Sequence, residues 1–482
     1  MSNLKRFFKD SIIYGIAAVL PRVINFLLVR VHTDALAAET YAENTDFYIW
    51  AAFFAVLLTF GMETTFFRFY KDAKEKDALV STSFISVGLW VAAFLIIFTL
   101  FFNPISHFFG FGNNSLRLQL FMAILALDTL AMIPFAFLRA SNRPIRYTFI
   151  KLVNVGIIVL IQLVALRWIP TWEQNGTVLP SWLTDNYASI SKVNYIFVAN
   201  LVGSALSFLL LLPYLVQFKW KFDQKLLKKM LSYSYPIVIA GMAYVVNENL
   251  DKFLIGKLID KETEGLYAAA YKLAIFMNLY IMAFRLGAEP FFFNISGQKD
   301  AKKTYAQIMK YFVIVGSFVL LGIVAFLDII KHFINPDYWV ALEIVPIVLL
   351  ANLFLGIYHN LSIWYKLTDK TRFGMYFSIF GAIITIVFNV VMLPKIGYMA
   401  SAWATLLAYG LMMLLSYWVG KKQYPIPYEL KKTLGYLLLG ISIAYGSYYL
   451  LEKSWVLSIA EIILFGLIIY YFEIRSLLKK NK

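Results

Sequence analysis

Apolar segments as long as a membrane-spanning helix recur from one end of the chain to the other, separated by short polar segments. An α-helix needs about 20 mostly apolar residues to cross roughly 30 Å of hydrocarbon, and each segment approaches that length. The pattern therefore predicts an all-α integral membrane protein with about fourteen transmembrane helices. The predicted spans are residues 11–31, 45–67, 81–102, 116–138, 147–168, 193–216, 231–255, 265–294, 311–330, 341–365, 373–393, 400–419, 433–451 and 455–474.

The composition is consistent with a membrane location for nearly the whole chain. Of the 482 residues 61% are hydrophobic and 15% are charged, and the mean hydropathy is +0.70. An ordinary soluble domain is about 45–50% apolar and about 25% charged. The first apolar segment carries Pro21, Arg22 and Asn25 where a cleaved signal peptide would have small residues, so we expect it to remain as the first helix.

The basic residues are distributed unevenly over the two sides of the predicted membrane. If the N-terminus is cytoplasmic, about 30 of the 44 Lys and Arg residues fall in cytoplasmic segments, as the positive-inside rule requires. We therefore predict that both termini are cytoplasmic. The net charge of +16 is dispersed among the spans rather than gathered in one patch, so nucleic acid is not an expected partner.

Residue types that carry common enzyme chemistry are scarce. The chain has no cysteine and four scattered histidines, which argues against disulfides, thiol nucleophiles and metal clusters. No catalytic residue, metal site or organic cofactor is predicted. Sodium ions or protons remain candidate coupling ions.

The two halves of the chain share a repeated pattern. Tyr41-Ala42, eighteen residues and then the segment 61–67 match Tyr267-Ala268, eighteen residues and then the segment 287–293, at a constant offset of 226 residues. This offset covers six helices, so the halves would have the same orientation and be related by an axis along the membrane normal. The predicted organisation is an N-terminal lobe at 1–216, a cytoplasmic linker at 217–230, a C-terminal lobe at 231–419, and two further helices with a cytoplasmic tail at 420–482.

Ionisable residues within the predicted spans are the candidates for function. Such residues cost about 2.5–3.5 kcal/mol each at a helix centre and normally face the protein interior or a water-filled cavity. Two sets, Glu248 with Lys252 and Arg285 with Glu289, have the i,i+4 spacing of a local ion pair. The full set is Arg22, Glu63, Asp128, Glu248, Asp251, Lys252, Lys272, Arg285 and Glu289.

These residues suggest roles in anion binding, coupling and gating. Arg22 is the strongest candidate for binding phosphate, because a guanidinium group holds two phosphate oxygens at once and stays charged. Asp128 and Asp251 are candidates for binding a coupling ion, or for pairing with Lys272 or Arg22. We expect Glu63 and Glu289, at matching ends of their spans, to pair with neighbouring basic loops, and they could form an inner gate.

Short motifs along nearly the whole chain resemble one known family. They are Pro21-Arg22-Val23 with Arg30, the segment 61–68, Tyr235-Pro236, Asp251-Lys252, Gly265-Leu266-Tyr267, Pro336 and Ile344-Val345-Pro346. Together they resemble the polysaccharide transporter branch of the multidrug/oligosaccharidyl-lipid/polysaccharide exporter superfamily, to which O-antigen (Wzx-type) and lipid II flippases belong.

The resemblance implies two six-helix lobes around a central cationic cavity that opens alternately to each side of the bacterial inner membrane. The substrate would be a polyprenyl-pyrophosphate-linked oligosaccharide, such as an O-antigen, capsule or exopolysaccharide repeat unit. Arg22 and Arg285 are similar in placement to cavity arginines of lipid II flippases and would bind the pyrophosphate. Lys272 and Lys252, as further basic residues within the spans, are also candidates for binding it. The last two helices would hold the lipid tail, and membrane lipids and polysaccharide polymerase or assembly proteins are the expected partners.

Two other functions compete with this interpretation. A small-molecule exporter of the same superfamily would need fewer cavity arginines and no lipid-linked substrate. A membrane-bound glycan polymerase or ligase would carry a large outer loop with catalytic residues, whereas the longest predicted outer loop runs only from about residue 169 to 191. The sequence therefore predicts a transporter rather than an enzyme.

Overall fold

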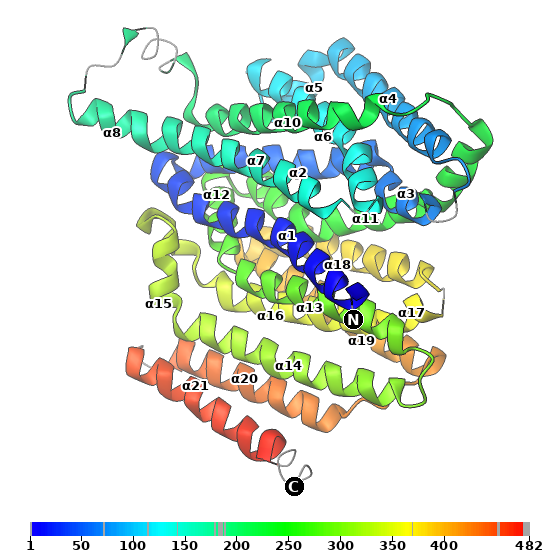
Figure 1. The fold of residues 1–482 in the computed structure, drawn as a ribbon. Helices are drawn as coiled ribbons and strands as arrows, with labels where there is room; N and C mark the ends of the chain where they lie inside the picture. Colours follow the sequence, from blue (N-terminus) through cyan, green and yellow to red (C-terminus); the bar gives the residue numbers. More distant parts are fainter. Residues whose placement is uncertain are drawn as a thin grey trace. The chain divides into compact units, whose positions relative to one another are not determined.

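The computed structural model describes residues 2–475 apart from 71–72, 113–114, 142, 178–179, 182–186, 188, 369 and 451–453. The predicted cytoplasmic tail after residue 475 lies outside the described residues. The described segments of regular structure are all helical, as Figure 1 shows. Contacts between residues divide the chain into two units, Met1–Val245 and Val246–Lys482, and the division falls within one long helix.

The helices of the N-terminal unit cover every span predicted there. The helix bounds are α1 Ser2–Ala35, α2 Ala38–Thr59, α3 Met62–Tyr70, α4 Lys76–Leu100, α5 Phe102–Phe108, α6 Ser115–Ala140, α7 Pro144–Leu163, a π-helical turn Val164–Trp168, α8 Ile169–Gln174 and α10 Lys192–Val216. Helix α11, Gln224–Leu258, starts within the segment predicted as a linker and continues into the second unit.

The C-terminal unit is also built from helices joined by short connections. After α11 the bounds are α12 Lys261–Lys272, α13 Ile275–Ile295, α14 Ala301–Ala325, α15 Leu327–Ile330, 3-10 turns at Lys331–Phe333 and Pro336–Ala341, α16 Ile344–Leu361, α17 Ile363–Leu367, α18 Arg372–Ile396, α19 Met399–Gln423, α20 Leu430–Leu450, α21 Trp455–Ile469 and a π-helical turn Tyr470–Ile474.

Many of these helices are long and apolar enough to cross a bilayer. Among the described residues eleven candidate spans meet both conditions, and a twelfth is formed by α12 and α13 together, which meet at an angle of 45°. The predicted first and thirteenth spans lie in α1 and α20, helices of 34 and 21 residues that stand outside this set. The protein is thus a multi-pass, all-helical membrane protein with eleven or twelve candidate spans.

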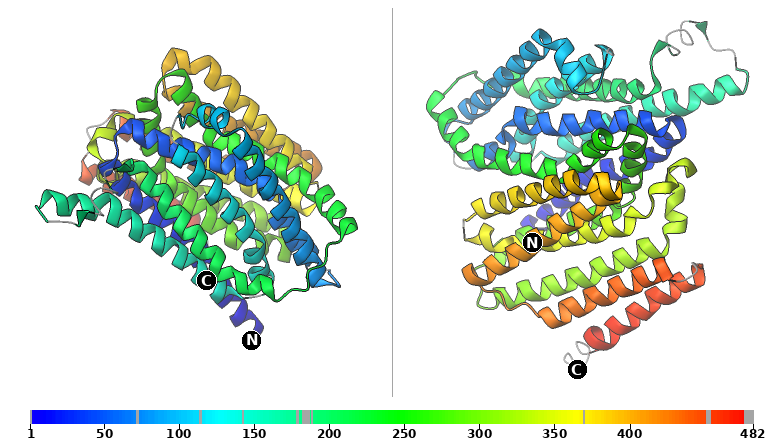
Figure 2. Two further views of the ribbon diagram at one scale, coloured as in Figure 1. Left: turned by 90° about the horizontal axis from the view of Figure 1, so that it is seen from above. Right: turned by 180° about the vertical axis from the view of Figure 1, so that it is seen from behind.

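Helix α6 is the core of the N-terminal unit. It is the most deeply buried candidate span of this unit and packs against α2, α4 and α10, while α10 also packs along α7 (Figure 2). Helix α1 lies on α7, where the buried ring of His32 is hydrogen-bonded through Nε2 to Oε1 of Gln162, at 2.8 Å. A sheltered polar contact of this kind fixes the register of two apolar helices, because neither partner can easily find water inside a membrane protein.

A break in the second predicted span separates α2 from α3. Phe60 and Gly61 adopt positive φ angles of 46° and 64°, and an added Cβ at Gly61 would lie 3.2 Å from a side-chain carbon of Ile237. Glycine adopts this backbone conformation without the steric cost that a side chain brings. The break leaves α3 as a separate helix that begins at Met62 and carries Glu63 in its first turn.

In the C-terminal unit, α16 belongs to the most deeply buried candidate span. It packs most extensively against α19, which in turn packs on α18. The last two helices, orange and red in Figure 1, lie beside α14. Lys310 of α14 is almost buried and forms an ion pair of 2.7 Å with Glu473, which also accepts a hydrogen bond from Tyr436 of α20 at 2.9 Å.

Candidate functional site

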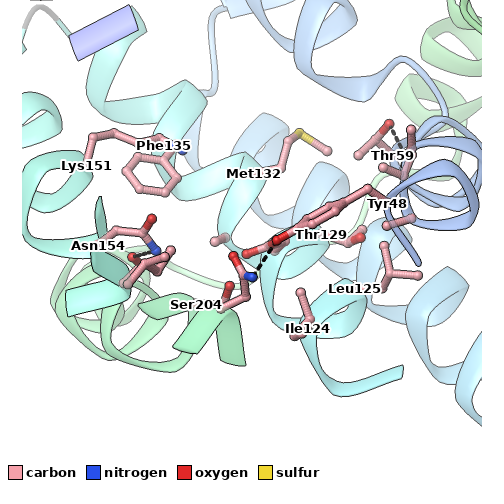
Figure 3. Close-up of a pocket in the computed structure, with 18 of the residues that line it drawn as sticks. Tyr48, Thr59, Ile124, Leu125, Thr129, Met132, Phe135, Lys151, Asn154 and Ser204 are labelled. Atoms are coloured by element: carbon pink, nitrogen blue, oxygen red, sulfur yellow. Dashed lines mark hydrogen bonds between the residues drawn. The ribbon is translucent and has the colours of Figure 1, made fainter. Parts of the chain in front are cut away.

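The N-terminal unit contains a cavity of about 610 Å³ within its helical bundle. Side chains of α2, α3, α6, α7 and α10 line it, and Figure 3 shows the labelled ones converging from these helices. The volume is within the roughly 300–1,000 Å³ of typical ligand sites. Its polar lining includes two residues from the predicted site, Asp128 and Glu63.

Asp128 and Lys151 place opposite charges on the walls of this cavity. Asp128 belongs to α6, whose apolar residues are mostly buried, yet its own side chain is exposed and opens into the cavity. The Nζ atom of Lys151, on α7, lies 4.2 Å from the centre of the Phe135 ring. In the described part of the chain Asp128 forms no ion pair, so the expected pairing with Lys272 or Arg22 is not observed.

Amides and hydroxyls complete the polar lining. Nδ2 of Asn200 donates a hydrogen bond of 2.7 Å to the Tyr48 hydroxyl, and Nδ2 of Asn154 donates one of 2.9 Å to Oγ of Ser207. Both amides thus use a donor within the protein, while their Oδ1 atoms accept no hydrogen bond from any described residue. A lining of amide oxygens, hydroxyls, two carboxylates, one ammonium group and aromatic rings can bind a ligand rich in hydroxyl groups.

Lys151 and the neutral polar residues of the cavity were not recognised from the sequence. Lys151 is not among the ionisable residues that the sequence singles out, but it lies in α7 and lines the cavity. The usable signal was helical spacing: Lys151 and Asn154 are three residues apart on α7, and Asn200, Ser204 and Ser207 recur after four and three residues on α10. Polar residues at this spacing share one face of an otherwise apolar helix.

The carboxylates predicted to pair with neighbouring basic segments do so. Arg139 Nη1 lies 2.7 Å from Oε1 of Glu63 in the N-terminal unit, and Lys366 Nζ lies 2.8 Å from Oε1 of Glu289 in the C-terminal unit. Glu289 also accepts a hydrogen bond of 3.2 Å from Arg285, so the predicted i,i+4 pair is confirmed. The role of these carboxylates in a gate stays a prediction.

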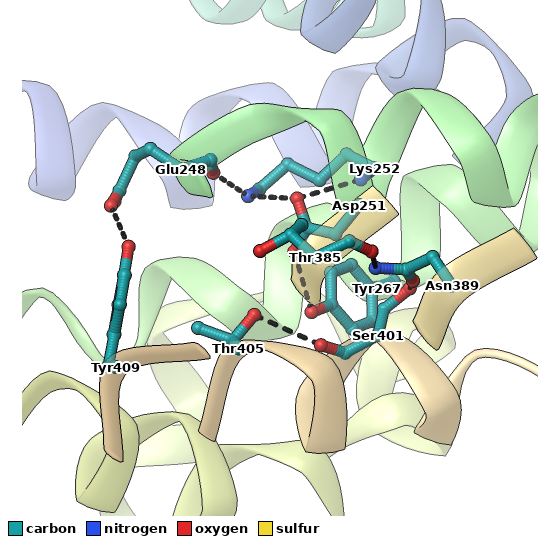
Figure 4. Close-up of polar contacts among 9 residues, drawn as sticks. All are labelled: Glu248, Asp251, Lys252, Tyr267, Thr385, Asn389, Ser401, Thr405 and Tyr409. Carbon is teal, nitrogen blue, oxygen red and sulfur yellow. Dashed lines mark hydrogen bonds and ion pairs between the residues drawn. The ribbon is translucent and has the colours of Figure 1, made fainter. Parts of the chain in front are cut away.

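The expected i,i+4 ion pair between Glu248 and Lys252 is wrong in detail. The ammonium of Lys252 donates to the backbone carbonyl of Glu248, at 2.7 Å, and forms its ion pair with Asp251, at 3.1 Å. The Glu248 carboxylate instead accepts a hydrogen bond from Tyr409 at 2.8 Å (Figure 4). Asp251 was expected to pair with Lys272 or Arg22, but its cationic partner is Lys252, its immediate neighbour in the chain. Adjacent residues do not have the i,i+3 or i,i+4 spacing that is typical of ion pairs along a helix.

The remaining basic candidates differ in their surroundings. Arg22 is exposed on α1 and makes no hydrogen bond or ion pair with any described side chain, so its guanidinium remains open to an anion. Lys272 ends α12 and is half-buried. Arg285 is partly exposed beside Glu289. Lys252 differs from all three because it is almost buried and already bonded to a carboxylate.

The helices and the cavity describe an all-helical membrane protein with a polar cavity inside its N-terminal unit. The model of the family described as "Polysaccharide biosynthesis protein" matches residues 7–296, more than half of the chain, and the chain belongs to this family. A second model, MatE, matches residues 236–391. Both belong to the multidrug/oligosaccharidyl-lipid/polysaccharide exporter superfamily, as the sequence resemblance predicted.

Individual relatives agree with this assignment. The "Lsg locus putative protein 1" of Haemophilus influenzae is 22% identical over 365 residues, which cover 72% of this chain and 78% of that protein. The solved structure of the lipid II flippase MurJ in an inward closed conformation superposes with a TM-score of 0.73, covering 98% of this chain and 100% of that one at 17% identity. An inward-facing multidrug resistance MATE transporter gives a TM-score of 0.66, covering 86% and 97% of the two chains at 10% identity. At these identities the two structures establish the fold alone.

Proposed function

We propose that this protein is a flippase for a polyprenyl-pyrophosphate-linked oligosaccharide, such as an O-antigen, capsule or exopolysaccharide repeat unit. It would move this lipid from the cytoplasmic to the outer leaflet of the bacterial inner membrane by alternating access. A charged sugar-pyrophosphate head group cannot enter hydrocarbon unaided, so the protein must offer it a polar path while the lipid tail stays in the bilayer. Membership of the polysaccharide biosynthesis family supports a glycan-linked substrate.

The observation that carries the proposal is the polar cavity of the N-terminal unit. Its amide, hydroxyl and carboxylate groups, which include Asp128, Asn154 and Asn200, match the many hydroxyl groups of an oligosaccharide. Its aromatic members, Tyr48, Phe135 and Tyr147, offer apolar faces to sugar rings. A polar cavity of this size suits transport, because it offers a polar head group the hydrogen-bonding partners that hydrocarbon lacks.

The architecture we propose has about fourteen spans, in two repeated halves of six helices followed by two more. It adds α1 and α20 to the candidate spans described above. Two matched features support the repeat: Tyr41 and Tyr267 are both fully buried, and Glu63 and Glu289 both pair with a basic residue 76 or 77 positions later. The distribution of Lys and Arg supports cytoplasmic termini.

We assign pyrophosphate binding to Arg22, with Arg285 and Lys272 as further candidates. Arg22 is the strongest of these because its guanidinium is exposed and has no partner among the described side chains. Arg285 would have to share its charge between Glu289 and the substrate. Lys252, also predicted to bind pyrophosphate, is poorly suited because Asp251 and a backbone carbonyl already occupy its ammonium group.

A coupling ion would drive transport by binding one conformation of the protein, inward-open or outward-open, better than the other. Asp128, which opens into the cavity without an ion-pair partner among the described residues, is the better of the two predicted coupling carboxylates. Glu63 and Glu289 would act in gating, since their ion pairs are partly exposed and can exchange partners at low cost. Membrane lipids and polysaccharide polymerase or assembly proteins are the proposed partners.

A small-molecule exporter is the second candidate. The MatE match over residues 236–391 and the fold shared with multidrug transporters favour it. This alternative predicts that ligand binding does not require a lipid-linked pyrophosphate.

Native mass spectrometry of the detergent-extracted protein can separate the two functions. We would add polyprenyl-pyrophosphate-linked oligosaccharides to the wild type, Arg22→Ala and Arg285→Ala. Arg372→Ala is the matched control, because Arg372 is also exposed and has no side-chain partner among the described residues. A flippase should form a tight adduct that Arg22→Ala loses and Arg372→Ala keeps.

Reconstitution then tests translocation itself. In proteoliposomes the wild type should expose the lipid-linked sugar to a probe on the outer face, and Arg22→Ala should abolish this exposure at unchanged protein content. No exposure by the folded wild type would sink the flippase proposal. An adduct indifferent to both arginine substitutions would shift the assignment to the small-molecule exporter.

A further inference from the structure

The ammonium group of Lys252 is enclosed within the C-terminal unit in the manner of a bound cation. Its side chain is 9% exposed, and that of Asp251 is 1% exposed. The Nζ atom lies 2.7 Å from the Glu248 carbonyl oxygen and 3.1 Å from Oδ1 of Asp251 (Figure 4). It also lies 3.8 Å from the centre of the Tyr271 ring. Two oxygens and one aromatic face thus surround it, and each of these groups attracts positive charge.

Groups other than Lys252 hold the two carboxylates in place. The hydroxyl of Tyr267, on α12, donates a hydrogen bond of 2.9 Å to Oδ2 of Asp251. The hydroxyl of Tyr409, on α19, donates one of 2.8 Å to Oε2 of Glu248. Both tyrosines are almost completely buried. The Asp251 carboxylate is therefore held from α12 and the Glu248 carbonyl is held by the backbone of α11, so neither oxygen depends on the lysine ammonium for its position.

A second layer of buried polar groups lies on α18 and α19. Oγ of Ser401 donates to Oδ1 of Asn389 at 2.5 Å, Nδ2 of Asn389 donates to the Thr385 carbonyl at 2.8 Å, and Oγ1 of Thr405 donates to the Ser401 carbonyl at 3.0 Å. All four side chains are fully buried on helices that are otherwise apolar. Neutral oxygen-bearing groups of this kind are suited to solvating a small hard cation next to a carboxylate.

The charge balance of this enclosure depends on the lysine. A buried carboxylate without a cationic partner is strongly unfavourable, and Asp251 has Lys252 as its only ion-pair partner among the described residues. Loss of the ammonium would leave an empty space of about its own volume. The negatively charged Asp251 carboxylate and the Glu248 carbonyl oxygen would surround that space. Within a low-dielectric interior this space would attract a small cation from solution.

We propose that Lys252 supplies the cation of a monovalent-cation site in the C-terminal unit. While the tethered ammonium is in place the site takes up no inorganic ion, and removal of the ammonium opens it to sodium. Asp251, one of the two carboxylates predicted to bind a coupling ion, is thus paired with the protein's own cation. Transport by the wild type does not draw sodium through this cluster, whatever the substrate.

The test uses the purified full-length protein and sodium chloride, with choline chloride at equal concentration as the reference salt. The variants are Lys252→Met and the double variant Lys252→Met/Asp251→Asn. Lys257→Met is the control, since Lys257 is exposed on the same helix. The readouts are the midpoint of thermal unfolding and the binding of radioactive sodium.

The wild type and Lys257→Met should bind no sodium at this site and show the same midpoint in both salts. Lys252→Met should unfold at a temperature several degrees higher in sodium than in choline, because a ligand that binds only the folded state stabilises it, and should bind about one sodium ion per chain. The double variant should lose both effects.

Three outcomes would overturn the proposal. One is sodium binding by the wild type that Asp251→Asn abolishes, because the site would then take an ion with the lysine in place. Another is a Lys252→Met protein that folds but responds equally to both salts. The third is failure of Lys252→Met to fold in either salt, which would mean that the enclosure does not persist without the lysine.

Discussion

The guanidinium of Arg139 donates a hydrogen bond of 2.7 Å to the carboxylate of Glu63, across 76 positions of sequence. In the second half of the chain Lys366 donates one of 2.8 Å to Glu289, across 77 positions. Glu63 and Glu289 are also the carboxylates of the repeated sequence pattern. Each half therefore joins the end of one helical segment to a later basic residue in the same way, although the basic residue is arginine in one half and lysine in the other.

The first prediction separates a gating role of these pairs from a structural one. The side chains of Arg139 and Glu63 are 42% and 46% exposed, and such exposed pairs contribute only about 0.2–1 kcal/mol. Glu63→Gln should therefore shift the unfolding midpoint little while changing the rate of transport. Restoration of transport by the exchange Glu63→Arg/Arg139→Glu would identify the pair itself as the gate. A large loss of stability in Glu63→Gln would instead assign it a structural role.

The second prediction concerns the attachment of the last two helices. Lys310 and Glu473 are 6% and 5% exposed, and Lys310 is also 3.4 Å from Glu429. Lys310→Met would remove the nearest cation from the buried Glu473 carboxylate and leave it beside Lys432, at 3.6 Å, which should cost about 1–3 kcal/mol of unfolding free energy. The double variant Lys310→Met/Glu473→Gln should recover much of this loss, because no charge then remains buried.

Thermal unfolding in a fixed detergent would measure these differences. Lys303→Met is the matched control, since Lys303 lies on the same helix and its ion pair with Asp300 is exposed. Equal stability of Lys310→Met and Lys303→Met would show that the buried pair does not hold α14, α20 and α21 together.

Much of the fold followed from the sequence because hydrocarbon imposes a simple rule. Each crossing needs a long apolar segment, and the predicted spans coincide with helices or with pairs of short consecutive helices. Breaks within the helical spans were harder to predict from the sequence. The predicted second span is broken at Phe60 and Gly61, and the eighth is bent between α12 and α13, where hydropathy gives no sign of a change in direction.

The site was predicted less completely because pattern alone does not tell which polar residues face one another. The partner of Asp251 proved to be the adjacent Lys252, and their side chains meet because Lys252 folds back over its own helix. Asn154 and Asn200 are neutral, so the cost of placing a charge in the membrane does not mark them as candidates for function. Their importance depends on the packing of α7 against α10, which is a property of the folded unit.

The third prediction tests the cavity of the N-terminal unit. Asp128 opens into it and forms no ion pair with a described residue, so Asp128→Asn removes a charge that a ligand can reach, while the ammonium of Lys151, which interacts electrostatically with Asp128, stays in the cavity wall. We expect substrate binding or transport to fall about tenfold, since a hydrogen bond to a charged group is worth about 1.5–3 kcal/mol. The unfolding midpoint should move by no more than about 2–4 °C, the shift that corresponds to about 1 kcal/mol in a domain of this size.

Binding of the lipid-linked oligosaccharide and thermal unfolding would be measured on the same preparation. Asp337→Asn is the control, because Asp337 is an exposed carboxylate in the 3-10 turn of the other unit. If Asp128→Asn binds and transports like Asp337→Asn, the cavity does not use its carboxylate for the substrate.

The fourth prediction compares the two glycines at equivalent positions of the repeat. Gly61 has a φ of +64° at the break between α2 and α3, with Ile237 close to the site of a Cβ, whereas Gly287 lies inside α13 with open space around it. Gly61→Ala should destabilise the protein by about 1–2 kcal/mol, the cost of a left-handed conformation for a residue with a side chain. Gly287→Ala should be neutral or stabilise by up to about 1 kcal/mol, because alanine is favoured within a helix. Thermal unfolding of the two variants side by side measures the difference. Equal effects of the two substitutions on stability would mean that the break between α2 and α3 does not require a glycine at position 61. The glycine at both positions would then be a feature of the repeated sequence and not a requirement of the local backbone.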